Sequence, residues 1–81
     1  MVTDGKDESL AMAAQIRAER AAAEMTIDQL AAASGMHKQT LMRYLKGTRD
    51  IPLAAFYAIA DGLGVAPGDL LARAQARHSK N

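Results

Sequence analysis

The sequence predicts a small all-α protein, and three observations point to this fold class. Apolar residues recur at spacings of three and four along most of the chain, which is the period of a helix with one buried face. No stretch alternates strictly between apolar and polar residues, as a half-buried strand does. Only two prolines, Pro52 and Pro67, interrupt a chain in which alanine, the strongest helix former, is the commonest residue.

The chain of 81 residues is long enough for one small domain and too short for two. The polar and acidic residues 1–8 are predicted to form a disordered leader, and residues 78–81 a frayed tail, leaving one domain over residues 9–77. The absence of cysteine excludes disulfides and thiolate metal sites. No apolar run reaches the roughly 18–20 residues that span a membrane, so we expect a cytoplasmic protein.

The first two predicted helices carry different N-terminal signals. The first should run from Ser9, its N-cap, to Ala23. The second begins after Thr26, because a threonine followed three residues later by Gln29 forms a capping box. It should end at Gly35, since glycine adopts the left-handed backbone conformation without strain.

The third helix is predicted over residues 38–46, with Gly47 directly after it. A turn of about 3.6 residues places Leu41, Tyr44 and Leu45 on one apolar arc. The opposite arc carries Lys38, Gln39, Met42, Arg43 and Lys46. Such a helix has one face for a core and another for a partner.

Two further helices are expected after this one. Pro52 suits the first turn of a helix that Gly64 ends. Its predicted buried stripe consists of Phe56, Ile59, Ala60 and Leu63. Pro67 suits the start of the last helix, in which Leu70 and Leu71 are expected to face the core.

Charge is distributed unevenly, although the net charge is only +1. Residues 37–50 contain four cations and one acid, whereas residues 1–28 contain three cations and six acids. A basic middle favours nucleic acid only weakly, because an ordinary solvated face has the same composition.

The second and third helices, joined by a short turn that contains glycine, form a helix-turn-helix arrangement. The residues expected to shape the unit are Leu30, Ala31, Gly35, Met36, Leu41, Tyr44 and Gly47. The major groove of DNA, about 12 Å wide, accepts a helix of this diameter. The outer arc of the third helix is therefore a candidate DNA-binding surface.

A resemblance to a known family covers residues 10–71. Residues 26–52 read TIDQLAAASGMHKQTLMRYLKGTRDIP and resemble the helix-turn-helix of the Cro and phage-repressor type, also called the XRE type. Residues 56–71, FYAIADGLGVAPGDLL, are similar to the fourth and fifth helices of those domains. The positions that fit the motif at their proper offsets are Thr26, Leu30, Ala31, Gly35, Leu41, Gly47, Leu63, Gly64 and Val65.

The resemblance implies a compact five-helix, lambda-repressor-like domain that binds double-stranded operator DNA with its third helix. It assigns base readout to Lys38, Gln39, Met42 and Arg43. It assigns contacts with DNA phosphates to Thr26, His37, Thr40, Lys46 and Arg49.

The same resemblance implies a transcriptional regulator, which we expect to be a Cro-like or minimal phage-type repressor. At 81 residues, the chain leaves no room for the separate oligomerisation or cleavage domain of longer repressors, unless it is a fragment. We expect a homodimer formed through the last helix and residues 72–78, with a monomer as the alternative. The expected location is the cytoplasm of a bacterium, or of the host cell if the protein is phage-encoded.

Three positions depart from the family pattern. Ile27 stands where the family often has a glutamine that meets a phosphate. Arg20 lacks the glutamate often found at the position of Leu45, so it needs another partner, such as Glu24, or faces solvent. Ser34 stands where the family prefers an aliphatic residue.

Two interpretations from another class stay open: an antitoxin that neutralises a toxin, and a helix-turn-helix fold used only for protein contacts. Catalysis has little support, because the two histidines are far apart in sequence and no acid pair, glycine-rich phosphate loop or metal-ligand spacing is present. We therefore do not expect an enzyme, nor a metal, cofactor, small-molecule ligand or membrane contact.

Overall fold

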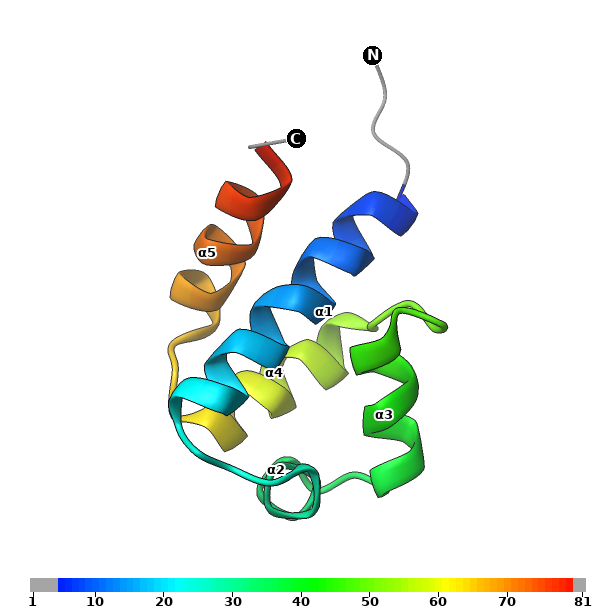
Figure 1. Cartoon of the computed structure of the whole chain (residues 1–81), viewed down its shortest axis with the longest axis vertical. Coiled ribbons are helices and arrows are strands. Elements are labelled where there is room, and N and C mark those ends of the chain that lie inside the picture. The colour runs from blue at the N-terminus through cyan, green and yellow to red at the C-terminus, as the bar shows by residue number, and fades with distance from the viewer. Residues whose placement is uncertain (1–4, 80–81) are drawn as a thin grey trace.

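The computed structural model describes residues 5–79, which form five α-helices (Figure 1). They are α1 (Gly5–Ala22), α2 (Ile27–Ser34), α3 (Lys38–Lys46), α4 (Leu53–Leu63) and α5 (Pro67–Ser79). α1 and α5 lie side by side and run in opposite directions, and α2 lies at the end of the molecule away from the two termini (Figure 1). The predicted all-α class and its five helices are confirmed.

The core is built from one apolar face of each helix. Five large side chains, one from each helix, are completely buried: Ile16, Leu30, Leu41, Ile59 and Leu70. Full burial of an aliphatic side chain of this size stabilises a fold by about 1.5–3 kcal/mol. No polar or charged residue is buried in the described part of the chain. All five helices therefore depend on one shared apolar contact region.

Local signals set the bounds of α2 and α3 as predicted. Thr26 Oγ1 accepts a hydrogen bond from the Gln29 N–H, and Gln29 Oε1 accepts one from the Thr26 N–H, which completes the capping box. Gly35 and Gly47 end the two helices with φ values of 67° and 75°. After each helix, two backbone N–H groups donate back to carbonyls of the last turn, as in a Schellman motif.

The prediction for the start of α1 was wrong. The helix begins at Gly5, so Ser9 lies inside it and is not its N-cap. Residues 5–8, expected in a disordered leader, belong to this helix, and two acids in its first turn stabilise the positive end of the helix dipole. Residues 1–4, the rest of the expected leader, lie outside the described residues.

Three smaller differences concern α4 and α5. Pro52 is the N-cap of α4 rather than a residue of its first turn. Residues 78–79 are helical, not frayed, and residues 80–81 lie outside the described part of the chain. Leu70 is buried, but Leu71 is 41% exposed, because side chains of adjacent residues in a helix point about 100° apart.

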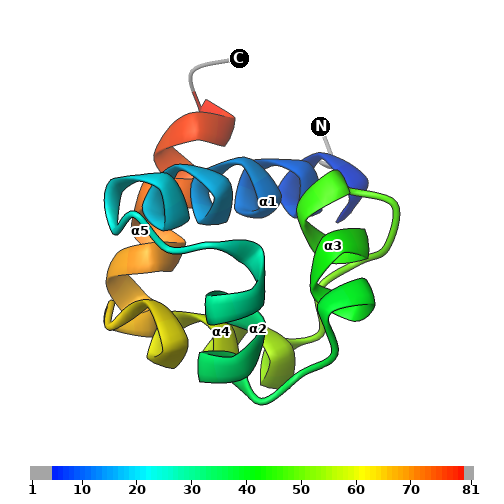
Figure 2. The same cartoon turned by 60° about the horizontal axis from the view of Figure 1, so that its bottom comes forward.

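α2 approaches α4 closely at Gly62, and Figure 2 shows α4 directly behind α2. A Cβ at Gly62 would lie 2.6 Å from Ser34 Oγ and 3.2 Å from the backbone nitrogen of the same serine. Ser34 Oγ is buried and has no hydrogen-bond partner in the structure. Because α4 lies so close at Gly62, a small residue is needed at position 34. This explains why Ser34 stands where the family prefers an aliphatic residue.

α1 ends in a Schellman motif whose left-handed residue is Glu24 instead of glycine. Its φ is 56°, the one positive value outside glycine among the described residues. The Met25 N–H donates to the Arg20 carbonyl at 3.1 Å, and the Glu24 N–H donates to the Ala21 carbonyl at 3.0 Å. The hydrogen bonds of the turn are therefore complete although its backbone is strained at Glu24.

Replacing Glu24 with glycine is expected to raise the free energy of unfolding by about 1 kcal/mol, because an L-residue pays a steric penalty in the left-handed region. Urea denaturation followed by circular dichroism measures the change. Glu24→Ala is the control, since it also removes the charge but keeps Cβ. If the glycine variant is no more stable than the alanine variant, the strain argument fails.

Gly62→Ala is expected to lower the free energy of unfolding by about 1–3 kcal/mol, because the new methyl group would meet the backbone of α2. This loss should exceed the helix-propensity gain of about 1 kcal/mol. Gly68→Ala is the matched control, since a Cβ there has no atom within 4 Å. Equal stability of the two variants in the same urea titration would contradict the prediction.

Candidate nucleic-acid interface

α2, the turn 35–37 and α3 pack together as one unit on the core. Leu41 is completely buried, and Tyr44 and Leu45 are only 6% and 4% exposed. The predicted contacts between the two helices come from side chains that are buried or packed against the core: Leu30, Ala31, Met36, Leu41 and Tyr44. Since one face of α3 is held in this way, its opposite face has a fixed direction.

The opposite face of α3 is open to solvent. The side chains of Lys38, Gln39, Arg43 and Lys46 are exposed, as the helical spacing predicts. Met42, predicted on the same arc, is half-buried, so part of its side chain packs on the protein. The structure thus brings four of the five outer-arc residues together as a solvated basic and amide surface.

The first turns of α2 and α3 expose backbone N–H groups, because the first residues of a helix have no intrahelical acceptor. In α2 the capping box satisfies the Gln29 N–H, while Thr26 Oγ1 keeps its own proton for another acceptor. In α3 the N-cap His37 is exposed and makes no side-chain capping bond. Both helix starts therefore offer donors to an anion.

The remaining residues predicted to meet phosphates differ in exposure. Lys46 and Arg49 are exposed, whereas Thr40 is half-buried. Lys46 lies in the last turn of α3, and Arg49 follows in the loop before α4. The predicted phosphate-binding residues are therefore spread from the start of α2 to the loop after α3.

An ion pair connects the two helices of the unit, and the sequence did not reveal it. Lys38 Nζ in α3 lies 3.2 Å from Asp28 Oδ1 in the first turn of α2. Their side chains are 53% and 74% exposed, so the pair contributes about 0–1 kcal/mol to stability. The ten-residue separation has no helical meaning, which is why no periodic pattern could indicate this contact.

Two arginines of α1 donate to backbone carbonyls. Arg20, for which Glu24 was the expected partner, is half-buried and donates through Nη1 to the Met25 carbonyl at 2.8 Å. Neither pairing with Glu24 nor simple exposure to solvent describes it. Arg17, for which the sequence carries no signal, donates through Nη1 to the Leu45 carbonyl at the end of α3.

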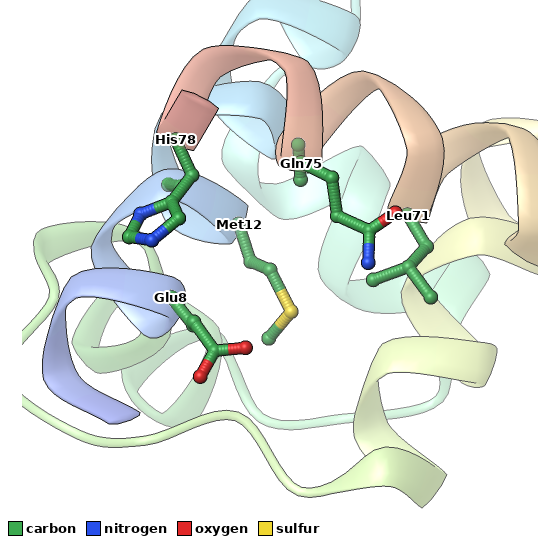
Figure 3. A pocket seen from close by; sticks show the side chains of 7 residues that line it. Glu8, Met12, Leu71, Gln75 and His78 are labelled. Atoms are coloured by element: carbon green, nitrogen blue, oxygen red, sulfur yellow. The ribbon is translucent and has the colours of Figure 1, made fainter. Parts of the chain in front are cut away.

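A shallow pocket lies between α1 and α5, on another part of the molecule. Figure 3 shows Glu8 and His78 at one end of it and Leu71 at the other, with Met12 in between. It is lined by Glu8, Ala11, Met12, Leu71, Ala74, Gln75 and His78. Residues 5–79 contain no group of three acidic, histidine or cysteine side chains that could hold a metal ion. No helix in the same range is long and apolar enough to span a membrane.

Comparisons with known proteins agree with this geometry. The model of a helix-turn-helix domain family matches residues 11–74. The structure is similar to the crystal structure of the clp gene regulator ClgR from C. glutamicum, with a TM-score of 0.81 and 24% sequence identity over 86% of this chain and 91% of that chain. At this identity the structural likeness establishes the fold. The comparison with curated proteins gave no match.

Proposed function

Because the chain belongs to the helix-turn-helix domain family, whose fold here is that of XRE-type DNA-binding regulators, we propose that it is a Cro-like repressor. It binds a short operator sequence with α3 in the major groove and blocks transcription there. As a member of a regulator family, it acts by binding and not by catalysis. The observation that carries the proposal is α3 itself, with one face buried in the core and the opposite face exposed and basic.

The residues on the exposed face of α3 contact the base edges in this proposal. Lys38 and Gln39 lie in its first turn, and Arg43 follows one turn later. A lysine or arginine suits the O6 and N7 atoms of guanine, and a glutamine suits the N6 and N7 atoms of adenine. The exposed part of Met42 suits the methyl group of thymine.

Phosphate contacts orient the helix in the groove. The open N–H groups at the start of α2 and the Thr26 hydroxyl contact the phosphates of one DNA strand. His37 and Thr40 accompany the N–H groups at the start of α3. Lys46 and Arg49 hold phosphates near its other end.

The repressor binds as a dimer, with half-sites about one helical turn, or ~34 Å, apart. α5 and residues 72–78 form the dimer surface in this proposal. In support, Leu71 is 41% exposed beside the pocket between α1 and α5, where a second copy would cover it.

Fluorescence anisotropy with labelled DNA tests operator recognition. The probes are DNA from upstream of the protein's own gene and a scrambled duplex, each titrated at several salt concentrations. Affinity for the upstream DNA should be higher and should fall steeply with salt, because phosphate binding releases counterions. Arg43→Ala should weaken upstream binding by about 10- to 100-fold.

The scrambled duplex is the matched control for Arg43→Ala, because a base contact contributes to binding of the operator and not of an unrelated sequence. Arg43→Ala should therefore weaken binding to the upstream DNA more than binding to the scrambled duplex. Equal, weak and salt-insensitive binding to both probes would contradict the proposal. A protein partner such as a toxin, captured from the host lysate, would then become the better explanation of the fold.

Asp28→Asn is expected to increase the affinity for the scrambled duplex by about two- to tenfold at low salt. The variant removes a negative charge from the start of α2 and releases Lys38 for phosphate contact. Asp69→Asn is the matched control, since Asp69 is also an acid in a first turn, that of α5. An unchanged affinity of Asp28→Asn in the anisotropy titration would show that α2 does not start near DNA.

A further inference from the structure

α1 contacts the far end of α3 at two points. The Arg17 guanidinium donates to the Leu45 carbonyl, although the two residues are 28 positions apart in the chain. Two turns nearer the start of α1, the tip of the Leu10 side chain lies beside Gly47, where an added Cβ would meet Leu10 Cδ2. The end of α3 is therefore held from outside the helix-turn-helix unit.

The hydrogen bond from Arg17 fills a gap that α3 cannot fill by itself. The last four carbonyls of a helix have no intrahelical donor. The Arg43 carbonyl accepts from the Thr48 N–H at 3.1 Å, and the Tyr44 carbonyl accepts from the Gly47 N–H at 3.1 Å. The carbonyl of the following residue, Leu45, accepts its hydrogen bond from Arg17.

We propose that Arg17 is a positioning residue for sequence recognition, which rests on the proposed function of α3. By holding the Leu45 carbonyl, it fixes the tilt of α3 relative to α1 and so the angle at which Gln39 and Arg43 meet the bases. It contacts no base in this role.

The short length of α3 makes such an anchor effective. A nine-residue helix is about 13 Å long, so a tilt of ~10° about one end moves the other end by ~2 Å. Base-edge hydrogen bonds are lost over a smaller displacement, because they weaken steeply with distance and angle. The turn 35–37 joins the first end of α3 to α2, and Arg17 holds the second end.

Arg17 is exposed, so a direct contact with a DNA phosphate is the competing role. The two roles differ in what they predict. A phosphate contact strengthens binding to all sequences alike and adds about one unit to the salt slope. A positioning residue strengthens binding to the matched sequence alone and leaves the salt slope unchanged.

The test uses the full chain and two probes: a duplex that the wild-type protein selects from a random 20-bp library, and a scrambled duplex of the same composition. Arg17→Met keeps the aliphatic stem and removes the donor, and it should weaken binding to the selected duplex about tenfold, with less than a twofold change for the scrambled one. Arg17→Lys retains a donor and should restore part of the loss. The salt slope should stay the same in all three proteins.

Equal loss on both probes, with a salt slope reduced by about one, would make Arg17 a phosphate contact and overturn the proposal. Unchanged affinity of Arg17→Met on both probes would also overturn it. Amide hydrogen exchange without DNA gives an independent readout, in which the residues at the end of α3 should exchange faster in Arg17→Met than in Arg17→Lys. Equal exchange in these two variants contradicts the anchoring itself.

The exchange measurement also separates this inference from the function on which it rests. If the wild-type protein selects no duplex from the library, operator recognition fails. Faster exchange in Arg17→Met would then still establish that Arg17 anchors α3. The exposed face of α3 would in that case bind a partner other than an operator.

Discussion

The structure depends on the burial of one face of α3 against a core to which every helix contributes. Leu41 is fully enclosed, and Tyr44 and Leu45 are nearly so, and all three belong to one core cluster with side chains from the other four helices. Their burial fixes the rotation of α3 about its axis. Turning the helix away from this orientation would expose apolar surface, at a cost in free energy of about 25 cal/mol per Å². The direction of the polar face is thus a consequence of hydrophobic packing. The cations on that face carry chemistry but do not determine where it points.

The charged side chains also fall into two groups, those that pair between helices and those that are exposed on α3. One acid of α1 pairs with α5: Glu19 accepts a hydrogen bond from Arg73 at 2.8 Å and another from Gln15 at 2.8 Å. The hydrogen bond from Arg73 is the largest cause that holds the pKa of Glu19 below its ordinary value. Arg77 donates to Gln15 in the same contact. Arg73 and Arg77 of α5 are thus engaged with α1. The cations of α3 are exposed, and among them Lys38 pairs with Asp28 of α2.

Local sequence signals predicted the part of the fold that local interactions determine. The bounds of α2 and α3 follow from a capping box and two glycines, all within a few residues of the helix ends that they set. The start of α1 could not be predicted in this way, because Ser9 is a good N-cap residue but the helix continues through it to Gly5. Leu71 was misplaced since two adjacent leucines give no indication of which one faces the core. The predicted base and phosphate contacts belong to a complex with DNA. In the free chain, most of the residues predicted to make them are exposed.

What the sequence missed at the site are contacts that no helical spacing predicts. Lys38 with Asp28, Arg17 with the Leu45 carbonyl and Arg20 with the Met25 carbonyl each join different elements. The two arginines show why such contacts escape a pattern: a carbonyl acceptor exists at every residue, so no partner side chain marks the site in sequence. The glutamate that relatives place opposite the position of Arg20 is absent here, and Leu45 is buried in its stead. Leu45 provides core packing through its side chain and an acceptor through its backbone. A helix end can therefore be tied to a neighbouring helix without any charged pair between them.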